Sequence, residues 1–221
     1  MESSAFNRFF VIVLAVFAPF SVTELSAQES ATLYASEFAA LAEGDFPPDL
    51  TYRGGGMQID KSEGDAMLRF QGGSWFHIAL ASILPESFDI EFDYYTSESY
   101  AVLFVAAFDA EVSGLSPPSY SGYRQGPFHF FSIANTSVGV AVDRAMDSLP
   151  MANANNSAFT HSVAPIRLEV RGKQAKIFVE GEQAVLLPSA DIPRTDVIEF
   201  FYGSMGAPGN GFIGNIRVTR L

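Results

Sequence analysis

The segment FDIEFDYY, residues 88 to 95, places an acidic side chain at every second position. In an extended strand, the carboxylates of Asp89, Glu91 and Asp93 would project from one face of a sheet. Paired carboxylates are the catalytic groups of most glycoside hydrolases, and carboxylates also accept hydrogen bonds from hydroxyl groups. The segment therefore allows three interpretations, which are glycosidase chemistry, glycan contact and a solvated sheet face.

Strand geometry disfavours catalysis. Side chains two positions apart on a flat strand are about 6.7 Å apart, and those four positions apart are about 13 Å apart. Retaining glycosidases need about 5 to 5.5 Å and inverting enzymes about 6.5 to 9.5 Å between carboxyl groups that lie on opposite sides of the sugar. Parallel carboxylates of one strand fit neither geometry without a bulge or strong curvature. If the protein is an enzyme, Glu91 with Asp89 or Asp93 would be its catalytic pair. We expect instead a solvated face opposite a core stripe of Phe88, Ile90, Phe92 and Tyr94.

Aromatic and cationic residues indicate where a ligand would bind. Tyr95 breaks the alternation on the acidic side, and a ring beside carboxylates offers a stacking surface with hydrogen-bond acceptors. The connection 109–126 is long, and loops of more than about 12 to 15 residues are usually functional or disordered. We predict ligand contacts by Tyr95 and by the loop residues Tyr120, Tyr123 and Arg124.

No cofactor is expected, and calcium is the one metal with candidate ligands. Asp109, Glu111 and Asp143 open the two long connections, but Ca²⁺ takes six to eight oxygen ligands. The histidines are isolated from one another, so we expect hydrogen-bonded or exposed side chains rather than metal ligands. The single tryptophan, Trp75, is expected in the core.

Beyond residue 30 the hydrophobic pattern has period two, which is typical of strands. The predicted strands are 57–60, 66–70, 75–82, 88–95, 101–108, 127–134, 137–143, 166–172, 175–181, 183–188, 196–202 and 212–221. About a dozen short strands indicate an all-β, two-sheet antiparallel sandwich.

Three features refine this arrangement. Gly172 and Gly181 can take the positive φ of tight turns, so the strands from 166 to 188 should form an antiparallel meander. Strand 101–108 is apolar on both faces and belongs in the centre of a sheet. The connection 143–162, with its ANANN run, is predicted to be a flexible loop.

The meander VAPIRLEVRGKQAKIFVEGEQ and the closing strand GFIGNIRV resemble the second half of the concanavalin A-like lectin/glucanase (laminin G-like) family. The first half, from GDFPPDLTYRGGGMQI through MLRF to ILPESFDIEFDYY, is similar to sandwich modules of some outer-membrane protein A family proteins. The resemblance implies a jelly-roll sandwich. Such modules in general bind carbohydrate or another surface, and some relatives are hydrolases. The resemblance therefore also implies a binding function.

The first 27 residues predict export. Arg8 precedes an apolar run from Phe9 to Phe20, and the small residues that end at Ala27 are typical of a signal-peptide cleavage site. We expect one β-sandwich domain over 28–221, located in the periplasm or outside the cell, with no membrane insertion after cleavage. The chain contains no cysteine, so packing rather than disulfides must hold the fold.

The charge excludes some partners. Removal of residues 1–27 takes away two glutamates and one arginine and moves the formal charge from −12 to −11. Such an acidic surface repels nucleic acid and anionic lipid. We predict a non-catalytic module that binds a carbohydrate or a cell-envelope surface. A glycoside hydrolase and an envelope module that binds protein are the alternatives, and the sequence leaves the oligomeric state open.

Overall fold

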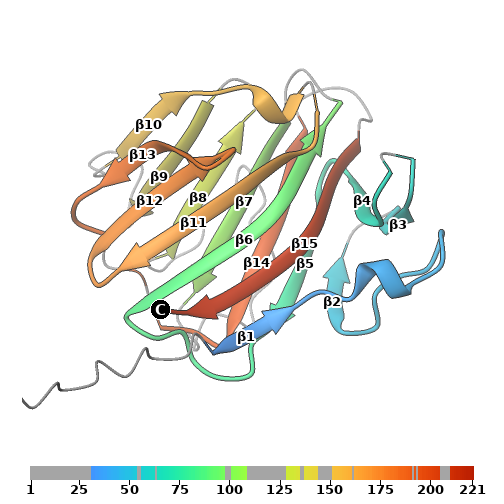
Figure 1. Ribbon diagram of the computed structural model, residues 1–221, viewed down its shortest axis with the longest axis horizontal. Coiled ribbons are helices and arrows are strands. Elements are labelled where there is room, and N and C mark those ends of the chain that lie inside the picture. The colour runs from blue at the N-terminus through green and yellow to red at the C-terminus, as the bar shows by residue number, and fades with distance from the viewer. Residues whose placement is uncertain are drawn as a thin grey trace, which may run out of the picture.

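The computed structural model describes residues 31–53, 56–62, 64–97, 101–108, 128–134, 137–143, 151–160, 162–190, 192, 194–204 and 210–221. Two antiparallel β-sheets pack face to face as a jelly-roll sandwich, so the predicted fold class is confirmed. In Figure 1 the eight-stranded sheet lies toward the viewer and the seven-stranded sheet lies behind it.

The eight-stranded sheet carries the acidic segment on one of its central strands. Its strand order is β13-β12-β11-β6-β15-β4-β3, and β1 pairs with β15. The bounds are β1 Thr32–Ala35, β3 Gln58–Asp60, β4 Met67–Gln71, β6 Ser87–Thr96, β11 Ala164–Arg171, β12 Gln174–Val179, β13 Glu182–Leu187 and β15 Asn210–Arg220. Strand β6 is paired along its length with β11 on one side and β15 on the other, which fixes the position of every acidic side chain.

The seven-stranded sheet has the order β10-β9-β8-β7-β14-β5-β2. Its bounds are β2 Leu50–Arg53, β5 Ser74–Ala79, β7 Ala101–Phe108, β8 Phe128–Ala134, β9 Ser137–Asp143, β10 Met151–Asn155 and β14 Val197–Ser204. Two short 3₁₀ helices, η1 Phe38–Ala40 and η2 Ala158–Thr160, complete the described elements. Strand β7 lies in the centre of this sheet, between β8 and β14, as its apolar sequence predicted.

The core fills the space between the two sheets. The predicted stripe of β6 faces inward, and its members Phe88, Ile90, Phe92 and Tyr94 are at most 2% exposed. Aromatic rings join the two layers, because Phe92 of β6 meets Phe200 of β14 edge to face at 5.6 Å between centroids. This burial of the inward stripe leaves the alternate, acidic positions of β6 on the outer face of the sheet.

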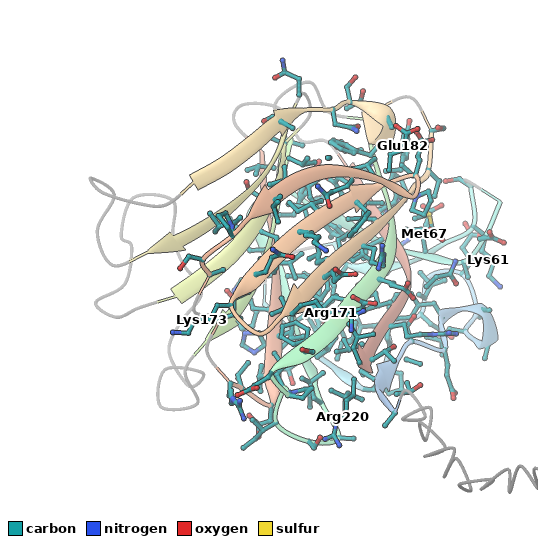
Figure 2. All side chains as sticks on the ribbon, turned by 60° about the vertical axis from the view of Figure 1, so that its left-hand side comes forward. Lys61, Met67, Arg171, Lys173, Glu182 and Arg220 are labelled. Atoms are coloured by element: carbon teal, nitrogen blue, oxygen red, sulfur yellow. The ribbon has the colours of Figure 1, made fainter. Side chains whose placement is uncertain are left out.

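The predicted meander is present as β11, β12 and β13. Gly172 has a φ of 56° and Gly181 has a φ of 83°, so glycine is favoured at both turns. Glu180 also has a positive φ, of 52°, which gives the β12–β13 turn the conformation of a type I′ hairpin. Figure 2 shows Lys173 and Glu182 at opposite ends of β12, next to these two turns.

Three strands differ from the sequence prediction. The segment 143–162 was predicted to be a flexible loop, but β10 lies within it and pairs with β9 from Met151 to Asn155. Its alternating Ala and Asn residues have low strand propensity, so ladder pairing at the sheet edge outweighs local preference. Strands β1 and β2 were also missed, because each is a four-residue strand that is too short to establish a period.

Candidate functional site

The three acids of β6 lie on the outer face of the eight-stranded sheet, as the alternation predicted. Glu91 and Asp93 are half-buried, but Asp89 is only 8% exposed. The expectation that all three acids are fully solvated is therefore wrong. Long side chains on the neighbouring strand β11 cover Asp89, since Arg167 and Glu169 project from the same face.

An ion-pair network surrounds Asp89. Glu169 lies directly opposite it on β11, and Arg167 Nη1 bridges the two, 2.9 Å from Glu169 Oε2 and 3.7 Å from Asp89 Oδ2. Lys176 Nζ on β12 donates to Glu169 Oε1 at 2.8 Å. The buried Oδ1 of Asp89 has no hydrogen-bond partner within the described part of the chain.

The two carboxylates of this network have opposite pKa shifts. Burial raises the pKa of Asp89, and the repulsion of Glu169 raises it further while Arg167 opposes both effects. Burial would also raise the pKa of Glu169, but the hydrogen bond and charge of Lys176, with Arg171 and Arg167, hold that pKa below its usual value. The ionised carboxylate of Glu169 therefore stabilises the folded state, whereas that of Asp89 destabilises it.

The shifts predict opposite effects of two amide substitutions. At pH 7, we expect Glu169→Gln to lower the free energy of unfolding by about 1.5 kcal/mol, because it loses charge-assisted hydrogen bonds. Asp89→Asn should raise it by about 0.5 kcal/mol, because like charges that lie opposite one another are unfavourable. Urea unfolding from pH 3 to pH 8 measures both.

The two pH profiles should also differ in sign. The Glu169 pKa is lowered on folding, so its contribution is present above the unfolded value of about 4.3 and is lost as the pH falls through the folded pKa. The Asp89 pKa is raised, so stability is lost as the pH rises through the folded value. Equal destabilisation by both substitutions at pH 7 would contradict this account.

The carboxylates do not adopt glycosidase geometry. Asp89, Glu91 and Asp93 leave one strand in parallel, so they would lie on one side of a sugar placed on this face. Hydrolysis requires groups that flank the glycosidic bond.

A groove of about 490 Å³ is hollowed into the same face. Its polar lining comes from three neighbouring strands, with Glu91 and Asp93 from β6, Arg167 from β11, and Asn215 and Arg217 from β15. The rigid Pro165 and the small Gly181 line the groove at the end where the β12–β13 turn contacts β11. In Figure 1 these strands lie side by side in the front sheet.

Charges alternate across the groove. Glu91 pairs in register with Arg167 on β11 and with Arg217 on β15, so its side chain leaves the sheet between those of two arginines. Arg167 is already engaged, because its guanidinium lies 3.8 Å from the centroid of the Phe178 ring and bonds Glu169. Arg217 is exposed and, among the described residues, forms no ion pair within 4.0 Å.

The predicted ligand residues lie in different places. Tyr95 is half-buried on the same outer face, and its ring stacks on that of Phe212 in β15 at 5.6 Å and 29°. The other predicted contacts, Tyr120, Tyr123 and Arg124, and the calcium candidates Asp109 and Glu111 lie outside the described residues. Asp143 ends β9, and its side chain also lies outside the description.

Asn215 and Arg217 were missed by the sequence reasoning. Segment 212–221 was predicted to be a regular strand, whereas β15 contains a register shift between Gly214 and Arg217. The Gly214–Asn215 dipeptide was the available signal, because glycine within a strand pattern often marks a bulge. The bulge turns both missed side chains toward the groove.

The outer face of the seven-stranded sheet contains a second polar cluster. His77 Nε2 lies 2.6 Å from Oε2 of Glu199, and the His77 ring lies 4.5 Å from that of Trp75. Glu199 is 1% exposed and Trp75 is 6% exposed. His77 is thus hydrogen-bonded, as expected, while Trp75 is buried on the outer face and not between the sheets.

The described residues contain neither a metal-ligand cluster nor a membrane-spanning helix. No group of three or more His, Cys, Asp or Glu side chains there is placed to hold a metal ion. No helix in that part of the chain has the length and apolar character needed to cross a membrane.

Comparison with known proteins identifies similarity at the level of the fold. No protein-family model matches the chain, and no curated protein matches its sequence. Among solved structures, a protein of unknown function with a galectin-like fold from Bacillus subtilis is similar, with a TM-score of 0.60 and 14% identity. The alignment covers 86% of this chain and 96% of that protein.

Botulinum neurotoxin structures are also similar. One is a structure of botulinum neurotoxin type C, whose cell entry depends on interaction with two ganglioside molecules. It has a TM-score of 0.57 at 11% identity, and the alignment covers 86% of this chain and 48% of the toxin chain. The binding domain of neurotoxin DC in complex with rat synaptotagmin II gives the same TM-score and identity over 86% and 49% of the two chains. This chain therefore spans about half the length of the toxin domains, and what it shares with all of these structures is the jelly-roll sandwich fold.

Proposed function

We propose that the chain is an exported, non-catalytic binding module that takes a carbohydrate in the groove on the outer face of the eight-stranded sheet. The observation that carries this proposal is the lining of the groove, where carboxylates, guanidinium groups and an amide meet around one hollow of about 490 Å³. Side chains of these types, held on strands, can bind a ligand without any change in the fold.

The chemistry of the lining suits a polyhydroxylated ligand. A sugar hydroxyl both donates and accepts hydrogen bonds, so it can pair with Glu91 or Asp93 as acceptors and with Asn215 or Arg217 as donors. The formal charge of −12 disfavours polyanions such as nucleic acids. The ganglioside interaction named for the type C toxin is consistent with glycan binding on a sandwich of this fold.

The remaining parts of the proposal come from the sequence. Residues 1–27 are proposed to be a signal peptide that sends the mature chain, from residue 28, to the periplasm or the cell exterior. There the partner would be a glycan or a glycan-bearing envelope surface. Membership of the concanavalin A-like lectin/glucanase family and ligand contacts by Tyr95, Tyr120, Tyr123 and Arg124 stay predictions.

A glycan array followed by titration of the best-bound glycan tests the function. We expect Glu91→Ala to weaken binding by about tenfold or more, since it removes a half-buried acceptor from the groove and corresponds to the loss of a charge-assisted hydrogen bond. Glu182→Ala is the matched control, because Glu182 is an exposed glutamate at the start of β13 that does not line the groove. A wild-type chain that binds no glycan, or equal affinities for Glu91→Ala and wild type, would refute the proposed site.

A further inference from the structure

A β-bulge shapes the groove from the side of β15. Asp93 pairs with Gly214, and Glu91 pairs with Arg217, so two steps along β6 correspond to three along β15. The extra residue lies at Asn215, which has a φ of 51°. Bulges are common beside binding sites because they redirect a side chain that regular pairing would place elsewhere.

The backbone conformation at position 215 is unfavourable for most residues other than glycine. A φ in this region favours glycine, and asparagine is among the few other residues that tolerate it. Asn215 and Glu180 are the two non-glycine residues with positive φ in the described part of the chain. The choice of asparagine over glycine therefore indicates a use for the amide side chain.

The amide of Asn215 is paired with a groove carboxylate. Its Nδ2 donates to Asp93 Oδ2 at 2.6 Å, and both residues line the groove. Because the carboxylate only accepts, the nitrogen and not the oxygen of the amide must face it. Asp93 retains Oδ1 as an acceptor, and Asn215 retains a second N–H and its carbonyl oxygen.

We propose that the Asp93–Asn215 pair recognises two adjacent hydroxyl groups of a neutral sugar, with Asn215 positioning the carboxylate. This inference rests on the proposed glycan-binding function and names the ligand class. The pair presents an acceptor beside a donor, joined by a short hydrogen bond, and this arrangement matches neighbouring hydroxyls that each donate and accept. The groove is lined by two carboxylates and two guanidinium groups, so its formal charge is balanced, and Asp93 itself would repel a carboxylate placed against the pair.

The test compares two substitutions that change the backbone in the same way. Asn215→Gly keeps a residue suited to positive φ and removes the amide, and we expect the affinity for neutral methyl pyranosides to fall about tenfold. Glu180→Gly makes the same replacement in the neighbouring turn, at an exposed residue that does not line the groove, and should leave affinity unchanged. Asp93→Asn provides a second groove variant of unchanged size and should also weaken binding.

Selectivity separates recognition from a structural role. The probes are methyl gluco-, galacto- and mannopyranosides and their mono-O-methyl derivatives, titrated by NMR together with thermal unfolding. Wild type should lose affinity when either hydroxyl of one adjacent pair is methylated, and Asn215→Gly should no longer distinguish these derivatives. Equal selectivity in wild type and Asn215→Gly would overturn the inference about the Asp93–Asn215 pair and leave the proposed glycan binding intact. A wild-type chain that binds none of the pyranosides and no glycan of the array would overturn both the inference and the proposed function.

Discussion

Phe200→Ala is expected to lower the free energy of unfolding by about 4 kcal/mol, the largest effect that we predict. Phe200 is 1% exposed, stacks on Phe76 with centroids 4.9 Å apart and planes at 4°, and meets Phe92 of the other sheet edge to face. Truncation would leave a cavity where the two layers meet. Urea unfolding monitored by circular dichroism measures the change.

Leu186→Ala is the control for this substitution. Leu186 lies on the outer face of β13 and is 42% exposed, so its truncation should change the free energy of unfolding by less than about 1 kcal/mol. Similar losses for the two variants would contradict the view that the sandwich is held by its interior.

His77→Ala is expected to have the second largest effect, lowering the free energy of unfolding by about 3 kcal/mol. The Glu199 side chain is 2% exposed, and its Oε2 lies within hydrogen-bond distance of His77 Nε2, at 2.6 Å. Removal of the imidazole takes a hydrogen-bond partner from a buried carboxyl group, which is more costly than the loss of a partner at an exposed site. Chemical denaturation at pH 7 gives the value.

His77→Gln tests whether the hydrogen bond is the cause. Glutamine retains an N–H donor and a side chain of moderate size, so it should recover part of the lost stability. If His77→Gln and His77→Ala are equally unstable, the loss arises from packing against Trp75 and not from the Glu199 hydrogen bond.

The candidate site illustrates the limit of local sequence patterns. Alternation placed Asp89, Glu91 and Asp93 on one face of β6 correctly, because the period of a strand is a local property. It did not reveal that Asp89 is buried, since the residues that cover it come from β11, more than seventy positions later. Exposure of an outer-face residue depends on its cross-strand neighbours.

The sequence by itself determined the all-β sandwich, the inward stripe of β6, the meander with its turns at Gly172 and Gly181, and the central place of β7. Each of these follows from hydrophobic period and turn chemistry within a few residues. Only the tertiary structure decided which strands are neighbours, and therefore that β6 lies between β11 and β15 and that a bulge brings Asn215 to Asp93. Strand pairing joins residues that are far apart in the chain, so the groove exists only after the sheet has formed.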